Sequence, residues 1–106
     1  MAVEKTEEID SLNKQAWDGA LVAPKAALET AYQALAAALA QNYQKGTADA
    51  HLNIGWCAYY LGDITSAYQG LVEAQSIYST LGDAEGSCKV MNALGVYYQE
   101  DRKSVV

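Results

Sequence analysis

The sequence is poor in the residues that build metal and redox sites. Its 106 residues include one histidine and two cysteines, and phenylalanine is missing altogether. One histidine gives no cluster of ligands, and Cys57 and Cys88 do not form a CxxC pair. Both cysteines fall in apolar stretches, so we interpret them as small hydrophobic side chains of a protein from a reducing compartment. We expect no metal ion and no cofactor.

Long apolar runs are also missing. The longest run, residues 34–40, has seven residues, whereas a helix that spans a membrane needs about 20. The N-terminal segment MAVEKTEEID is charged and lacks the apolar stretch of a signal peptide. We therefore expect a cytoplasmic protein that has no membrane partner.

Basic residues are few. Seven Lys and Arg stand against thirteen Asp and Glu, which gives a formal net charge of -6. Proteins that bind nucleic acid need a basic stripe to neutralise phosphates. The basic residues here are scattered, and only Arg102 and Lys103 are adjacent. We predict no nucleic-acid partner.

The usual catalytic patterns are absent as well. Neither GxxxxGKS/T nor GxGxxG occurs, so there is no ready cradle for nucleotide phosphates. His51 is the single histidine, and no Ser or Cys lies in a known nucleophile motif that it could serve as a base. Acidic pairs such as Glu7-Glu8 fall in the first turns of predicted helices, where the helix dipole accounts for them. We predict no catalytic residues and a protein that is not an enzyme.

The residues that are present favour helices. The apolar fraction is 51%, and only one proline occurs; alanine is abundant and loses no side-chain entropy in a helix. Short breaks, each with a glycine, divide the chain: Asp18-Gly19, Lys45-Gly46, Leu61-Gly62-Asp63 and Leu81-Gly82-Asp83. They predict helices over residues 4–17, 24–44, 47–61, 63–80 and 83–99. Such short turns fold helices into antiparallel hairpins, so we predict an all-α fold in a single domain, 1–106.

Two segments recur along the chain. The segment AYQAL at 31–35 returns as AYQGL at 67–71, an offset of 36 residues that Gly46 and Gly82 share (82 − 46 = 36). Gly55 and Gly95, in a second pair of similar segments, are 40 residues apart (95 − 55 = 40). The growing offset predicts one extra helical turn in the later unit. A period of 36 to 40 residues with two helices per unit is typical of helical solenoids.

Residues 54–77 resemble a tetratricopeptide repeat, in the variety of roughly forty residues. The family has a Leu-Gly pair in the first helix of each unit and small residues twelve and nineteen positions after that glycine; Ile54-Gly55, Ala67 and Ala74 stand there. Leu94-Gly95-Val96, followed by two tyrosines, matches the first-helix pattern again. The resemblance implies a right-handed α-solenoid of about five helices, packed through Gly55, Ala67, Leu71, Ala74, Leu94 and Gly95.

The resemblance also divides the chain into units. Residues 1–45 form a degenerate first hairpin, 46–82 a second repeat, and 83–106 a truncated third repeat whose second helix should begin near Asp101. An incomplete solenoid leaves an apolar face uncovered. We therefore expect either a piece of a longer protein or a homodimer, with exchange of the C-terminal helix as one route to it.

In this family the first helices of the units line a concave groove that holds peptides or partner helices. The equivalent positions are Asp49, Leu52, Asn53, Trp56, Tyr59, Tyr60, Lys89, Asn92, Val96 and Gln99. Asn53 and Asn92 would bond the backbone of an extended peptide, and Trp56 and Tyr60 would pack against its side chains. In the alternative interpretation, Trp56 and the tyrosines fill the core of the repeats. Lys89 alone is too little for the basic clamp that holds a terminal carboxylate.

The resemblance implies a protein-interaction scaffold or regulatory module that binds a protein or peptide. Repeats ending in Leu-Gly-Asp are similar to those in bacterial signalling proteins such as diguanylate cyclases and sensor kinases, so we expect a fragment of such a protein. Three alternatives stay open at this point. The chain could be a sensor for a small ligand or signalling peptide, a helical subunit of an enzyme whose catalytic residues lie elsewhere, or a purely structural oligomerisation unit.

Overall fold

A computed structural model describes residues 2–105, and the side chains of residues 6–99. It contains five α-helices in that range and no strand: α1 (Ala2–Gly19), α2 (Pro24–Ala40), α3 (Gln44–Tyr60), α4 (Ile64–Leu81) and α5 (Ala84–Val105). The prediction of an all-helical fold is therefore confirmed. Over the same range, none of the helices combines the length and the apolar character that crossing a membrane requires.

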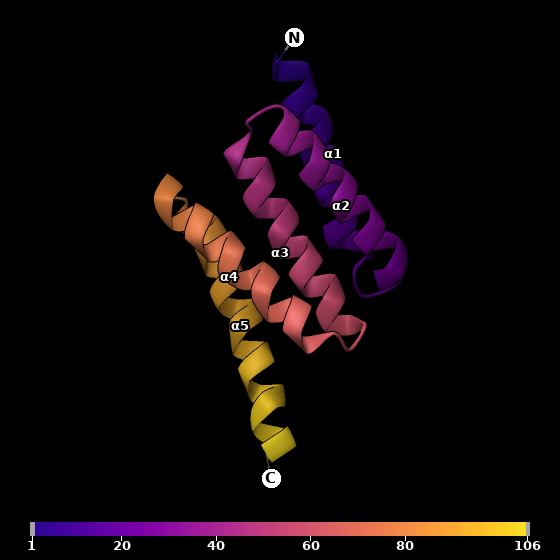
Figure 1. The fold of residues 1–106 in the computed structure, drawn as a ribbon, viewed down its shortest axis with the longest axis vertical. Helices are drawn as coiled ribbons and strands as arrows, with labels where there is room; N and C mark the ends of the chain where they lie inside the picture. Colours follow the sequence, from indigo (N-terminus) through magenta and orange to yellow (C-terminus); the bar gives the residue numbers. More distant parts are fainter. Residues whose placement is uncertain (1, 106) are drawn as a thin grey trace.

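The helices are arranged in two layers along an elongated molecule of 53 × 29 × 18 Å. Each helix packs against the next one in the chain, and α3 also contacts both α1 and α5. Over the described residues, α2 and α4 do not contact each other. The odd-numbered helices thus form one continuous layer, and the even-numbered helices lie apart on its other side. The C-terminal part of α5 extends past the ends of α3 and α4 (Figure 1).

The turn signals around α4 act as the sequence predicts. The side chain of Asp63 accepts a hydrogen bond from the backbone N–H of Ser66 at 3.1 Å and caps the start of α4. Gly82 ends this helix in the left-handed conformation, with φ of 69°. A residue with a Cβ atom is strained in that conformation, which glycine adopts freely. The Leu-Gly-Asp pattern therefore ends one helix and starts the next.

The predicted break at Lys45-Gly46 is wrong. The turn lies earlier, at residues 41–43, and Gly46 is inside α3. Asn42 supplies the left-handed residue of this turn, with φ of 54°; asparagine tolerates that region better than most residues. Gly46 is needed for a different reason: a Cβ atom there would lie 2.8 Å from Cγ2 of Ile9. Gly46 therefore allows close contact between α1 and α3, and it does not end a helix.

The predicted extra turn in the later unit is also wrong, because the period is uniform. The first residues of α2 and α4 are 40 apart (64 − 24 = 40), as are those of α3 and α5 (84 − 44 = 40). Ala31 is thus the eighth residue of α2, whereas Ala67 is the fourth residue of α4. A shift of four residues keeps nearly the same helix face, because a turn has about 3.6 residues. Both alanines are accordingly buried.

The helical break expected near Asp101 does not occur, since α5 runs without interruption to Val105. The reason lies in the sequence after Gly95, which contains no further glycine or proline and several good helix formers. The tail therefore continues α5 and does not start a second helix of a third unit.

Small residues form the contact between α3 and α4. A Cβ atom on Gly70 would lie 2.8 Å from the carbonyl oxygen of His51 and 2.9 Å from the nitrogen of Gly55. A Cβ atom on Gly55 would lie 2.9 Å from the carbonyl oxygen of Ala67. The two helix backbones therefore touch here, and only glycine fits at either position. Gly70 was not among the predicted packing residues, although it is the centre of this contact.

The other predicted packing positions divide into two groups. Ala67 is buried where α4 meets α3. Leu71 and Ala74 are buried in a cluster between α3, α4 and α5, and Leu94 is half-buried against that cluster. Gly95, by contrast, is exposed, and a Cβ atom there would have no neighbour within 4 Å. Its assignment as a packing glycine is not met in this structure, because no described helix crosses α5 at that position.

Candidate binding groove

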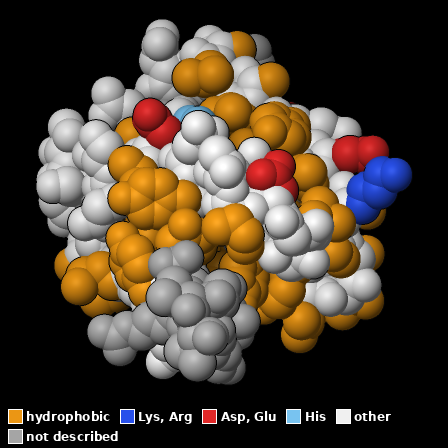
Figure 2. Space-filling view, turned by 60° about the horizontal axis from the view of Figure 1, so that its bottom comes forward, with side chains coloured by type: hydrophobic (Ala, Val, Ile, Leu, Met, Phe, Trp, Pro, Cys, Tyr) orange, Lys and Arg blue, Asp and Glu red, His pale blue; other side chains and the backbone are white. Residues whose placement is uncertain are grey.

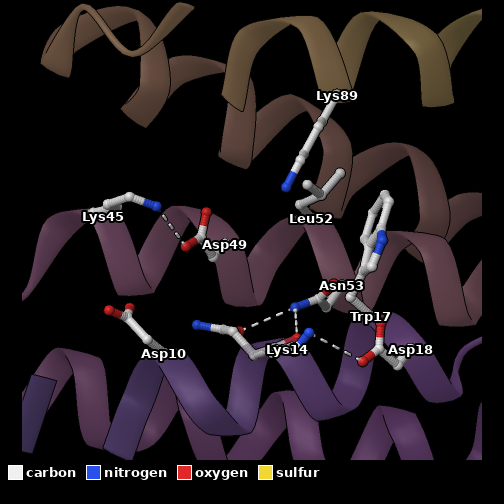
Figure 3. A pocket seen from close by; sticks show the side chains of 10 residues that line it. Asp10, Lys14, Trp17, Asp18, Lys45, Asp49, Leu52, Asn53 and Lys89 are labelled. Atoms are coloured by element: carbon white, nitrogen blue, oxygen red, sulfur yellow. Dashed lines mark hydrogen bonds and ion pairs between the residues drawn. The ribbon is translucent and has the colours of Figure 1, made fainter. Parts of the chain in front are cut away.

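A cavity of about 340 Å³ opens on the layer formed by α1, α3 and α5 (Figure 3). Four of its lining residues belong to the groove predicted from the sequence: Asp49, Leu52, Asn53 and Lys89. Six others were not predicted: Asp10, Asn13, Lys14, Trp17, Asp18 and Lys45. Five of these six come from α1, so the first hairpin contributes more to the site than its weak repeat pattern indicated.

The rim of the cavity carries charges of both signs. Lys14 lies 3.8 Å from Asp18, and Lys45 lies 3.1 Å from Asp49. Both pairs are one helical turn apart, a spacing that brings side chains together on one face. The lining thus contains three aspartates and three lysines. A partner of one uniform charge would meet repulsion from half of these groups.

Asp49 is the most firmly held of the charged residues. One carboxylate oxygen accepts a hydrogen bond from Nζ of Lys45, and the other accepts one from the hydroxyl of the buried Tyr78 in α4. Burial, and then this bond to Asp49, raises the pKa of Tyr78. Burial alone would lower the pKa of Lys45, but its bond with Asp49 and the charge of Asp49 raise it. Asp49 therefore links the rim of the cavity to the hydrophobic core.

Two asparagines form the floor between α1 and α3. Nδ2 of Asn53 donates to the backbone oxygen and to Oδ1 of Asn13, at 3.0 and 3.1 Å. Nδ2 of Asn13 donates to the backbone oxygen of Gly46 at 3.1 Å. Oδ1 of Asn53 is buried and has no hydrogen-bond partner. The donors of Asn53 are therefore used inside the chain, so in the predicted contact with a peptide backbone Asn53 can serve only as an acceptor.

An aromatic ladder runs from the cavity along α3. The rings of Trp17 and Trp56 are stacked with centroids 6.3 Å apart, and Trp56 in turn stacks on Tyr59 at 5.7 Å. Tyr60 meets the edge of Trp56 at 5.3 Å. Trp56 also packs against two core clusters, so it serves the core and the surface together. Trp17, with 38% of its area exposed, is the more accessible of the two tryptophans.

Lys89 reaches the cavity from α5, on the side opposite α1. Its Nζ lies 5.3 Å from the centroid of the Trp17 ring, within the range of a cation–π contact. Figure 3 shows its side chain extending from its helix toward the cavity. A second contact, 4.0 Å to the largely exposed Glu85, is at the limit for an ion pair. Both contacts of Lys89 are thus weak ones.

Six predicted groove residues do not line the cavity: Trp56, Tyr59 and Tyr60 lie in the aromatic ladder, and the other three lie on α5. Asn92, Val96 and Gln99 lie on the exposed part of α5 and do not line the cavity. Prediction from family positions assumed that α5 follows the layer over its whole length, but its C-terminal part leaves the body of the molecule (Figure 1). A signal for the missed Asn13 did exist. Asn13 and Asn53 are 40 residues apart (53 − 13 = 40), which is the period of the helices.

The opposite side of the molecule has a second hollow, between α2 and α4 over α3. His51 lies there with Tyr32 and Glu73. Burial lowers the pKa of His51, and the charge of Glu73 opposes this only in part. Among the residues that the structure describes, no three His, Cys, Asp or Glu side chains form a possible metal site. This hollow brings together no group of the predicted groove.

Comparison of the chain with protein-family models, with curated proteins and with solved structures finds no match. The residues of the cavity and their geometry are therefore the basis on which a function is inferred.

Proposed function

We propose that the chain is a tetratricopeptide-like solenoid module. Three observations support this. The starts of α2 and α4, and those of α3 and α5, are 40 residues apart, the odd-numbered helices form one layer, and glycines lie where α3 and α4 meet. Each of these is expected when one hairpin is stacked on the next.

In this proposal the module docks a segment of another protein and has no catalytic activity of its own. The observation that carries it is the cavity itself, which is built by the same layer of three successive odd-numbered helices. It combines an accessible tryptophan with paired charges at its rim. Tryptophan is among the commonest residues that dominate binding energy at protein interfaces, and paired charges favour one orientation of the partner. A cytoplasmic role in a larger bacterial signalling protein is the setting that the sequence resemblance supports.

Selection of a phage-displayed peptide library on the purified chain tests the docking role. The affinity of the selected peptides is measured by fluorescence polarisation on the wild type, on Trp17→Ala and on Tyr32→Ala. Trp17→Ala should weaken binding by about tenfold or more. Tyr32 is equally aromatic and more exposed but lies outside the cavity, so Tyr32→Ala should leave the affinity unchanged. Equal affinities for all three chains would refute docking in this cavity.

A small-ligand sensor is the second candidate, and the size of the cavity favours it. About 340 Å³ lies near the lower limit of pockets that hold small molecules, roughly 300 to 1,000 Å³. A sensor would show a rise in melting temperature with one member of a metabolite panel. If the chain is such a sensor, the library selection should also give no peptides whose binding depends on Trp17.

We also propose that the chain forms a homodimer through α5. A Cβ atom on Gly95 would have no neighbour within 4 Å, whereas Gly55, which is 40 residues earlier, packs against α4. Met91, Val96 and Tyr98 are exposed on the same helix, and Figure 2 shows hydrophobic side chains with few charges at the end of the molecule where α5 projects. Exchange of α5 between copies would use the same surface. Light scattering should give a dimer mass for the wild type and a monomer mass for Met91→Glu/Val96→Glu. Leu39→Glu, on α2, is the matched control, and a monomeric wild type would refute the proposal.

A further inference from the structure

We infer that the cavity between α1, α3 and α5 receives an arginine side chain of the docked segment, on the face of Trp17 that Lys89 covers in the free chain. This inference rests on the proposed docking function and adds the chemistry of the partner. It depends on the Lys89 contact, on the unpartnered floor atom and on the charge balance of the lining.

Lys89 shows what the ring of Trp17 attracts. Its ammonium group comes from a different helix and lies 5.3 Å from the ring centroid, so the ring already holds a cation. The contacts of Lys89 are weak enough to be replaced, because Glu85 is 4.0 Å away with an 86% exposed side chain. Exposed ion pairs of this kind contribute little. A guanidinium group stacks on an aromatic face and offers five donors, and is therefore a better occupant than the lysine.

The floor of the cavity supplies an acceptor for such a group. Asn53 is 3% exposed and lines the cavity, and its Oδ1 is one of two buried side-chain atoms among the described residues that have no hydrogen-bond partner. An unpaired buried acceptor is costly, and a donor that reaches it removes the cost. An N–H of a guanidinium can do this, whereas a carboxylate has no proton to offer.

The charges of the lining agree with a single cation. When the ammonium of Lys89 swings out, three aspartates and two lysines remain. Lys14 and Lys45 stay with Asp18 and Asp49. The carboxylate of Asp10 accepts hydrogen bonds from the hydroxyl of Tyr43, at 2.9 and 3.2 Å. Tyr43 is neutral, so the charge of Asp10 is not cancelled there. One arriving guanidinium restores the balance that Lys89 provided, whereas an arriving anion would not.

Titration with acetyl-arginine methylamide, followed by NMR, tests the site. The chain has two tryptophans, so its indole N–H signals are assigned with the Trp17→Phe variant. The Trp17 signal should shift and saturate with the arginine probe. The matching citrulline derivative keeps N–H donors but lacks the charge, so it should cause a much smaller shift at the same concentration. Equal shifts with both probes would overturn the inference.

Replacement of Lys89 gives a second, sharper test. Lys89→Met removes the competing ammonium, so the arginine probe should bind roughly two- to fivefold more tightly, as expected from loss of an exposed cation–π contact. Lys25→Met makes the same charge change on α2, outside the cavity, and should leave the affinity as in the wild type. No gain for Lys89→Met over Lys25→Met overturns the inference, once thermal melts show that both variants are folded.

The two proposals fail in different ways. If library peptides bind through Trp17 but contain no arginine that their affinity requires, docking stands and the arginine inference is refuted. If the arginine probe binds at Trp17 but no peptide does, the cation site stands and protein docking is refuted. A spermidine titration then identifies free polyamines as the source of the cation.

Discussion

The glycines of α3, α4 and α5 predict opposite effects for one chemical change. Gly70→Ala adds a Cβ atom 2.8 Å from the carbonyl oxygen of His51 and 2.9 Å from the nitrogen of Gly55. Both atoms belong to the backbone of α3, which cannot turn aside as a side chain would. Gly95→Ala adds the same atom to the middle of α5, where nothing lies within 4 Å. The first change should destabilise the fold and the second should stabilise it.

The magnitudes follow from two contributions. Replacing glycine with alanine inside a helix stabilises by about 1 kcal/mol, and this applies at both positions. Overfilling a tight contact costs about 1–3 kcal/mol, and this applies only at Gly70. The helix contribution cancels when the two variants are compared with each other. Their free energies of unfolding should therefore differ by about 1–3 kcal/mol, with Gly95→Ala the more stable.

Thermal unfolding followed by circular dichroism measures this difference. At about 4–8 °C per kcal/mol for a domain near this size, the variants should melt at least about 4 °C apart. Each melt is repeated at two chain concentrations, because a dimer through α5 would make the effect of Gly95→Ala depend on concentration. Equal melting temperatures, or a more stable Gly70→Ala, would show that α3 and α4 do not touch through their backbones.

Three further changes test the site and the core. Asn53→Ala removes the donor to Asn13 and should lower the free energy of unfolding by about 1–3 kcal/mol in urea titrations. An unchanged free energy of unfolding would show that this bond does not hold α1 against α3. The pKa of Tyr78 is raised by burial, so the stability that it provides is fully present below its unfolded pKa of about 10 and is lost as pH rises above it. Melting temperatures measured from pH 8 to 11 should therefore fall above pH 10, and less so in Tyr78→Phe; equal slopes would contradict this. Burial raises the pKa of the Cys57 thiol to about 11, while Cys88 is exposed. Ellman's reagent should thus modify one thiol quickly in the folded chain and two in denaturant; two fast thiols, or Cys88→Ser without effect on the fast phase, would be inconsistent with this burial.

The number and order of the helices could be predicted because the Leu-Gly-Asp pattern has the same effect wherever it occurs in this chain. Gly62 and Gly82 both have positive φ and end their helices, and the aspartate that follows caps the next one. Gly46 could not be assigned in the same way. Glycine serves either where the backbone turns to positive φ or where two helices touch, and sequence alone does not separate these uses. The true stop was Asn42, which carries a side chain and is a weaker signal.

The site was predictable only in part, for a reason that lies in its construction. Asp49, Leu52, Asn53 and Lys89 were found because α3 and α5 carry the repeat pattern. Trp17 and Asn13 were missed because α1 lacks that pattern, although it supplies half of the lining. No local rule connects Asn13 with Asn53. Only the period of 40 residues does so. The sequence showed this period between Gly55 and Gly95, but the offset of 36 between the two AYQ segments led to its interpretation as a growing offset.

The period also explains how a layer of repeated helices forms a site whose two walls differ. Residues 9, 49 and 89 are separated by 40 and lie on successive odd-numbered helices, where they are Ile9, Asp49 and Lys89. Ile9 is buried, Asp49 is half-buried and bonded to the core through Tyr78, and Lys89 is exposed over Trp17. The residue at this repeated position is thus apolar in α1, acidic in α3 and basic in α5. Its side chain is also less buried in each successive helix. Because α1 and α3 are joined through Asn13 and Asn53, they form the fixed wall of the cavity. The adjustable wall is α5, and a docked segment that displaces Lys89 has to break only its contact with the Trp17 ring and its long ion pair with Glu85.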